Sequence, residues 1–354
     1  MQELNYYRSS QKNCLIKEEK NLKDTAYGSS NVLIRVYENN LLNRGHYDRM
    51  LAADSFEDAV NVLRETPYRN DVDRIKEDKN YDTMLMNELH QTFDELFNIS
   101  PNKALIELFG LRYAYHNLKV LFKEEFTDQD MDHLFIPIGR YDIADLRQAV
   151  RTGASDVLPE PYLDSIHEVQ EDYDQYHNPQ AVDIILDRRF FTHMRILADE
   201  TGEQGIPEMV ETFIDYQNLS TLTRAMRQNR TRNFLKTILS SSGSIPKEEL
   251  VEIANKDMST AANILGNTKY KSIIEASIDP ETNELSPVRL DFATDNAYME
   301  MMRNAKLAAF GPLPIVAFIY AKETEVKNLR LILSGKENGV SADGIRERMR
   351  LNYA

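Results

Sequence analysis

The stretch from Pro314 to Lys336 constrains the fold of this chain more than any other. It predicts a single helix that begins at Pro314 and stops at Gly335, because proline suits the first turn of a helix and glycine suits its end. The first turns, residues 315–319, are apolar on every side, so we expect them to be buried on every side. From Lys322 onward the apolar face narrows to a stripe, which is formed by Val326, Leu329, Ile332 and Leu333.

A helix of about 20 residues is long enough to cross a bilayer. Five charged side chains lie inside this one, however, and each charge is costly in hydrocarbon. These are Lys322, Glu323, Glu325, Lys327 and Arg330. We therefore expect a buried helix of a soluble protein. The chain has no run of 18 apolar residues, and its first residues do not resemble a signal peptide.

The rest of the chain also predicts helices. Apolar residues recur at helical spacing, and alternation of β-branched residues is missing at useful length, so the predicted fold class is all-α. The main predicted helices span residues 31–42, 71–99, 101–125, 162–200 with an interruption near 178–179, 207–224 and 288–310.

Three of these helices share a short phrase, which indicates an internal repeat. The copies are Tyr115-His116-Asn117-Leu118, Tyr216-Gln217-Asn218-Leu219 and Val326-Lys327-Asn328-Leu329. Their asparagines are 101 and 110 residues apart. A second phrase runs from Ala59 to Tyr68 and returns 202 residues later, from Ala261 to Tyr270. In each of the three copies of the first phrase, we expect the leucine to be a core position.

The repeat predicts three similar helical subdomains. Their expected bounds are 27–125, 126–235 and 236–354, after a polar N-terminal extension at 1–26. Similar helical units placed side by side can form a ring or funnel with pseudo-threefold symmetry around a central cavity.

The repeated asparagines allow two interpretations. Asn117, Asn218 and Asn328 either satisfy backbone groups where helices meet, or face the cavity and contact a partner. Asp215 precedes Asn218 by three residues and Glu325 precedes Asn328 by three, so each pair shares a helix face and can form a hydrogen bond.

Composition excludes several classes of protein. The net charge of −15 argues against a nucleic-acid partner and against adhesion to anionic lipid. A single cysteine, Cys14, forms neither a disulfide framework nor a zinc site, which fits a reduced, cytosolic setting. No phosphate-binding loop and no Gly-x-Gly-x-x-Gly motif is present, so we predict no nucleotide site or other cofactor.

Catalytic and metal-binding groups are equally sparse. Asp130 and His133 have a ligand-like spacing but stand alone, and residues 171–174 are better explained as a solvated acidic helix face. His116 lies on an apolar helix, where a core or cavity-lining role is more common than catalysis. We predict no catalytic residue and no metal site.

The C-terminal stretch carries a resemblance. The run from Tyr320 to Arg330, then Gly335-Lys336, Ile345-Arg346-Glu347 and Tyr353, resembles the C-terminal signature of the C subunit of the archaeal and bacterial A/V-type rotary ATPases. Its eukaryotic relative is the AC39, or d, subunit, and the phrase here is closer to the prokaryotic branch. The helix at 31–42 is similar to the opening helix of that family.

The resemblance implies a non-catalytic rotor protein built from three similar helical units around a cavity. Such a protein sits on the membrane rotor ring at the cytoplasmic face of the membrane, without inserting into lipid. The central shaft, made of the D and F subunits, stands in its cavity, and the rotor protein couples ATP turnover to H⁺ or Na⁺ transport. Candidate partner-facing or cavity-lining residues are Arg112, Asn117, Asp215, Asn218, Arg224, Glu325, Asn328 and Arg330.

The residues also leave open a free-standing helical-repeat scaffold that binds a partner helix or peptide. Co-purification separates the two, because a rotor protein should be isolated with the shaft and the ring. An all-α enzyme is a third class, but no motif in the sequence supports it.

Overall fold

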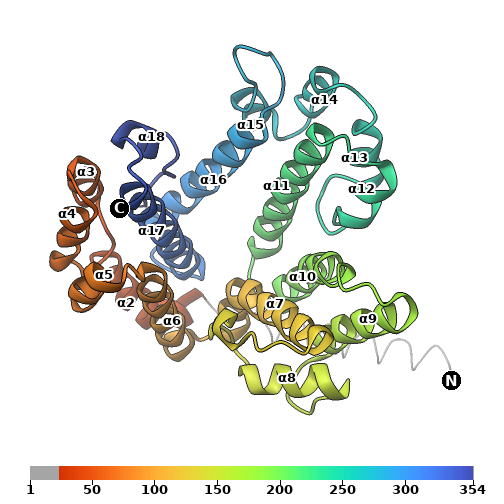
Figure 1. Ribbon diagram of the computed structural model, residues 1–354, viewed down its shortest axis with the longest axis horizontal. Coiled ribbons are helices and arrows are strands. Elements are labelled where there is room, and N and C mark those ends of the chain that lie inside the picture. The colour runs from red at the N-terminus through yellow and green to blue at the C-terminus, as the bar shows by residue number, and fades with distance from the viewer. Residues whose placement is uncertain (1–23, 354) are drawn as a thin grey trace. The chain divides into compact units, whose positions relative to one another are not determined.

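The computed structural model describes residues 24–353, and every regular element in that range is a helix (Figure 1). A single isolated bridge in that range joins Ile278 to Leu285. The all-α prediction is confirmed. Within the described range, contacts group the chain into two compact units, which are described separately. Unit 1 contains residues 24–27, 101–222 and 230–251, and unit 2 contains residues 28–100, 223–229 and 252–353.

Unit 1 is built around α7 (Lys103–Thr127), which packs against α8 (Ile143–Thr152) and α10 (Ala181–Glu200) (Figure 1). Its other α-helices are α9 (Glu160–Tyr176), α11 (Ile206–Arg227) up to residue 222, α12 (Arg232–Ile238) and α13 (Lys247–Ile253) up to residue 251. Short 3₁₀ helices, η1 and η4, span Asp24–Tyr27 and Asp132–Leu134. Fourteen residues of α7 are buried, including Tyr115 and Leu118, so this helix runs through the core of the unit.

Unit 2 is built around α17 (Leu313–Glu337), which contacts α2, α4, α6, α16 and α18 (Figure 1). The α-helices of this unit are α2 (Gly28–Glu38), α3 (Arg44–Ala52), α4 (Phe56–Asn61), α5 (Val72–Asp78), α6 (Tyr81–Ile99), α14 (Met258–Leu265), α15 (Lys271–Ala276), α16 (Pro287–Asn304), α17 and α18 (Ala342–Arg346). Its 3₁₀ helices are η2 (Val62–Glu65), η3 (Pro67–Asp71) and η5 (Ala305–Leu307).

The burial of α17 exceeds what its sequence indicates. Residues 315–319 are buried, as expected, and the apolar stripe that follows them is buried too. Burial continues through Val326, however, and includes Lys322, Glu323 and Glu325. The prediction that the buried face narrows from Lys322 onward was therefore wrong. Neighbouring helices surround this part of α17 and supply polar partners for its charges.

Gly335 does not end α17, as its position in the sequence had suggested. The helix continues to Glu337, and Gly339, with φ of +66°, supplies the left-handed residue beyond its end. Gly335 instead allows a close approach of α18. A Cβ at this position would lie 2.6 Å from Cδ1 of Ile345, so the Ile345 side chain would have to shift to make room for it.

Two other predicted helices are shorter than expected. The predicted helix at 71–99 breaks at Lys79, which has φ of +55°, and α6 starts after Asn80, whose side chain accepts from the amide of Thr83. The predicted helix at 288–310 ends at Asn304, apart from the turn of η5. Beyond it, backbone carbonyls of residues 305–311 accept hydrogen bonds from Asn31 and Arg35 of α2 instead of continuing a helix.

The division into three subdomains stays a prediction. It rests on sequence repeats, whereas the two units above are defined by contacts and do not test it. The extension at residues 1–26 lies almost wholly outside the described residues. No helix in the described range is both long enough and apolar enough to cross a membrane.

Candidate functional site

The three repeated asparagines occupy the same chemical setting. In each case the side-chain amide donates to the carbonyl of a residue further along the chain and accepts from the amide of that same residue, as a second peptide group would. The pairs are Asn117 with Ile136, Asn218 with Ser240 and Asn328 with Arg350. The six donor–acceptor distances lie between 2.7 and 3.0 Å. We call these three arrangements the asparagine clamps.

Burial makes the clamps structural. Asn117, Asn218 and Asn328 are each no more than 2% exposed. The first interpretation of the asparagines, that they satisfy backbone groups, therefore describes their hydrogen bonds. The leucine that follows each asparagine is also buried, as expected of core positions. A backbone amide and carbonyl held inside the protein need such partners, because an unpaired buried polar group is costly.

The second repeated phrase also keeps its hydrogen bonds. The hydroxyl of Thr66 donates to the carbonyl of Leu63 at 2.7 Å and accepts from the amide of Tyr68. Thr268 does the same with Leu265 and Tyr270, again at 2.7 Å for the first bond. Both copies therefore form the same turn, and both tyrosines are buried.

The shared helix face had suggested a hydrogen bond between Asp215 and Asn218, but the two side chains do not bond each other. Asp215 is fully buried and accepts from the backbone amides of Ser244, at 2.8 Å, and Ile245, at 3.2 Å. It also accepts from the Ser244 hydroxyl. The neighbouring Gly243 has no room for a Cβ, which would collide with the Asp215 carboxylate. Asp215 and the second clamp thus fix one segment, residues 240–245, against α11.

Glu325 belongs to a buried charge cluster inside unit 2. The ammonium group of Lys322 lies 2.9 Å from carboxylate oxygens of both Glu325 and Glu88. The Tyr68 hydroxyl donates to Glu325 at 2.7 Å, and the Leu42 backbone amide donates to its other oxygen at 2.5 Å. Glu325 therefore joins α17 to η3 and to the segment after α2, and Lys322 joins α17 to α6.

The cluster perturbs its titratable neighbours. Burial, together with the negative charge of Glu325, raises the pKa of Tyr47 and Tyr68 well above the ordinary tyrosine value. Burial works against the charge of Lys322, but Glu325 and Glu88 together outweigh it and raise the pKa of that lysine. These groups are tuned to stay in one protonation state, which suits a structural junction.

The three arginines among the candidate residues are more exposed than the five other candidates. Arg224 is exposed and pairs with Asp291, and Arg330 reaches the surface and pairs with Asp82 at 2.6 Å. Arg112 is half-buried on α7. Five of the eight candidates are therefore buried inside their units. Contact of any of the eight with a partner stays a prediction.

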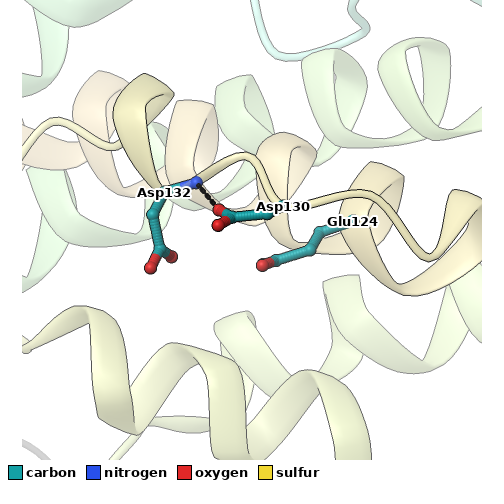
Figure 2. Close-up of side chains that lie close together, drawn as sticks. All are labelled: Glu124, Asp130 and Asp132. Carbon is teal, nitrogen blue, oxygen red and sulfur yellow. Dashed lines mark hydrogen bonds between the residues drawn. The ribbon is translucent and has the colours of Figure 1, made fainter.

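Three acidic side chains lie together near Asp130, where the sequence had suggested only the spacing of Asp130 and His133. Figure 2 shows the side chains of Glu124, Asp130 and Asp132 close together at the end of α7 and in the segment that follows. The backbone amide of Asp132 donates to Asp130 at 2.9 Å. Arg147 already bonds both Glu124 and Asp132 at 2.7 Å, so its charge offsets part of the negative charge of the group. We assign no metal site there.

The buried charge cluster was missed by sequence reasoning. Glu88 lies 234 residues before Lys322, and nothing in the sequence marks the two as partners. The asparagine clamps were only half found, since the repeat identified the asparagines but not the backbone residues that they hold. The available signal for the cluster was the run of three charged side chains at 322–325, which directly follows the apolar turns of the helix.

Comparison with known proteins agrees with the resemblance in the C-terminal stretch. The sequence model of the ATP synthase (C/AC39) subunit family matches residues 30–348. The C subunit of the V-type sodium ATPase of Enterococcus hirae is 36% identical over 328 residues, which cover 92% of this chain and 99% of that protein. The C subunit of the A-type ATP synthase of Methanocaldococcus jannaschii is 24% identical, covering 90% of this chain and 85% of that protein. The family match and the near-complete coverage at 36% identity show that this chain belongs to the ATP synthase C/AC39 subunit family.

Proposed function

We propose that this chain is the non-catalytic central-stalk component of a prokaryotic V/A-type rotary ATPase, where it links the D and F shaft to the membrane rotor ring. In that position it couples ATP turnover to the transport of H⁺ or Na⁺. The observation that carries the proposal is the match along almost the whole chain to a protein named as the C subunit of a V-type sodium ATPase.

The internal bonding of the chain supports this role. A coupling protein transmits torque between two partners, so its helices should not slide past one another. The three clamps each tie a long helix to a segment 19 or 22 residues further along the chain. The charge cluster ties α17 to α6, η3 and the segment after α2. Directional bonds of this kind resist sliding better than apolar packing alone, because their energy depends on both distance and angle.

The proposed placement is peripheral, at the cytoplasmic face of the membrane. The partners are the D and F proteins of the shaft and the c/K proteins of the ring, with neither nucleic acid nor lipid as a partner. The net charge of −15 favours protein partners over anionic lipid or nucleic acid. Three similar helical units around a cavity would give the shaft its seat, and the recurrence of the clamps supports such units.

The test is a reconstituted complex in sealed vesicles, prepared with and without this protein. ATP-driven uptake of H⁺ and of Na⁺ is measured alongside ATP hydrolysis. We expect uptake to vanish when the protein is omitted, hydrolysis by the soluble head to persist, and uptake to return when the purified protein is added back. Undiminished uptake in its absence would refute the coupling role, and ATP turnover by the purified chain would refute the non-catalytic one.

A further inference from the structure

A groove on unit 2 has no role in the arrangement described above. It runs along α16 between α15, which packs against α16 (Figure 1), and the segment that follows α18. Its volume is about 800 Å³, and its lining is mostly apolar. The apolar part of the lining, which we call the floor, includes the side chains of Ile273, Ala276, Phe292, Ala293 and Ala297.

Two arginines on the walls of the groove lack ion-pair partners among the described residues. Arg289 on α16 and Arg348 after α18 are both exposed, and neither side chain forms an ion pair or hydrogen bond with another described residue. Arg350 differs from them, since it bonds Asp295 at 2.6 Å and lies over the ring of Phe292.

The charges around the groove are unusual for this protein. Glu347 is the one carboxylate among the described residues that line it. The backbone amides of Glu281 and Thr282 lower the pKa of Asp279, and the charge of Arg289 lowers it further, but Arg289 forms no ion pair with that residue. In a chain with a net charge of −15, two guanidinium groups beside an apolar floor are a local reversal of sign.

The dimensions of the groove suit a helix. Its wall on α16 extends from Val288 to Ala297, which is roughly 14 Å at about 1.5 Å per residue, or between two and three helical turns. An apolar floor of this length with charged walls is how proteins hold the apolar face of an amphipathic helix. A small anion would bind one arginine but would leave the apolar floor uncovered.

We propose that this groove binds an amphipathic helix of the shaft, with apolar side chains on the floor and carboxylates paired to Arg289 and Arg348. Arginine presents a planar fork that matches a carboxylate with two hydrogen bonds. The shaft is favoured over the ring because helices of a membrane ring lie in the bilayer and offer mainly their ends, whereas this groove takes the side of a helix. The identification of the partner as the shaft rests on the proposed function.

The experiment measures the dissociation constant of the purified D and F pair for the full chain by isothermal titration calorimetry. The test variant combines Arg289→Glu with Arg348→Glu. We expect it to bind the shaft at least about tenfold more weakly, because like charges now face the carboxylates. A second variant, Arg289→Lys with Arg348→Lys, keeps the positive charge and should lose much less affinity.

A matched control carries the same change in net charge elsewhere on unit 2. Arg69→Glu with Lys256→Glu reverses two exposed cations that form no side-chain bond with described residues, and it should bind as the wild type does. Circular dichroism and thermal unfolding check that each variant folds.

The outcomes separate this inference from the proposed function. If the wild type binds the shaft pair and the double Glu variant binds it equally well, the groove assignment is overturned and the coupling role stands. Failure of the wild-type chain to bind the shaft pair at all would count against the proposed function itself. Weakened binding to purified ring, with binding to the shaft unchanged, would overturn the shaft as the occupant.

Discussion

Asn218 holds the backbone of Ser240 through two hydrogen bonds, 22 residues further along the chain, and Asn328 holds Arg350 in the same way at the same separation. The same bonding pattern at the same spacing shows that the Asn-Leu phrase marks a recurring structural motif. The first clamp, at Asn117, has a separation of 19 residues, so the segment between the asparagine and its backbone partner varies in length while the bonding pattern is the same.

The first prediction concerns the clamps. Asn218→Ala should lower the free energy of unfolding by about 2–4 kcal/mol, because it leaves a buried amide and a buried carbonyl of Ser240 without partners. Urea unfolding followed by circular dichroism measures the change. Asn70→Ala is the control, since Asn70 is exposed, and it should fall within about 0.5 kcal/mol of the wild type. A loss at Asn218 as small as that of the control would mean that the clamp adds nothing.

The second prediction concerns the buried charge cluster. Lys322→Met should destabilise the protein by about 3–5 kcal/mol, because the buried Glu325 and the half-buried Glu88 then lie close together without a cation. Adding Glu325→Gln should recover part of that loss, since one unpaired charge is removed. A double-mutant cycle in urea measures the coupling, and simple additivity would contradict the cluster as described. Arg44→Met, which breaks an exposed pair with Asp48, is the control and should have little effect.

The third prediction separates two helical glycines of unit 2. Gly335→Ala should destabilise the protein by about 1–2 kcal/mol, because overpacking against Ile345 exceeds the gain in helix propensity. Gly28→Ala meets nothing within 4 Å and should be neutral or slightly stabilising. Thermal unfolding of both variants gives the comparison. Adding Ile345→Val to Gly335→Ala should restore part of the loss, and equal stability of the two single variants would refute the close approach.

The fourth prediction concerns pH. His193 is buried against the Tyr115 hydroxyl, and burial lowers its pKa to about 3. The unfolded chain binds a proton at this position below about pH 6.5, whereas the folded chain does not, so this histidine makes stability fall as pH drops from about 6.5 toward 3.

The contribution of His193 to that fall is at most about 1.4 kcal/mol for each pH unit. His193→Asn can keep a bond to Tyr115 but cannot titrate, so its stability should decline less than that of the wild type between pH 7 and pH 5. Urea unfolding at each pH measures the two slopes, with the exposed His133→Asn as control. Parallel slopes for the wild type and His193→Asn would rule out this source of acid sensitivity.

Local features of the sequence determined the fold class and the repeat. Helices were predictable because their bonds join residues four apart, so apolar spacing along α7, α11 and α17 carries the signal within a single window. The same locality made the two repeated phrases visible and made Leu118, Leu219 and Leu329 recognisable as core positions.

The tertiary structure alone decided what the polar groups do. Asn218 was visible in the sequence, but its partner is a backbone group in a loop, and backbone groups carry no sequence signal. The sequence predicted that the apolar face narrows from Lys322 onward, but Lys322 and Glu325 are buried. Lys322 is paired there with Glu88, which lies 234 residues earlier in the chain. Gly335 had the position of a helix stop and is instead a packing contact with Ile345. Hydrogen bonds, ion pairs and close contacts depend on distance in space, which only the folded chain sets.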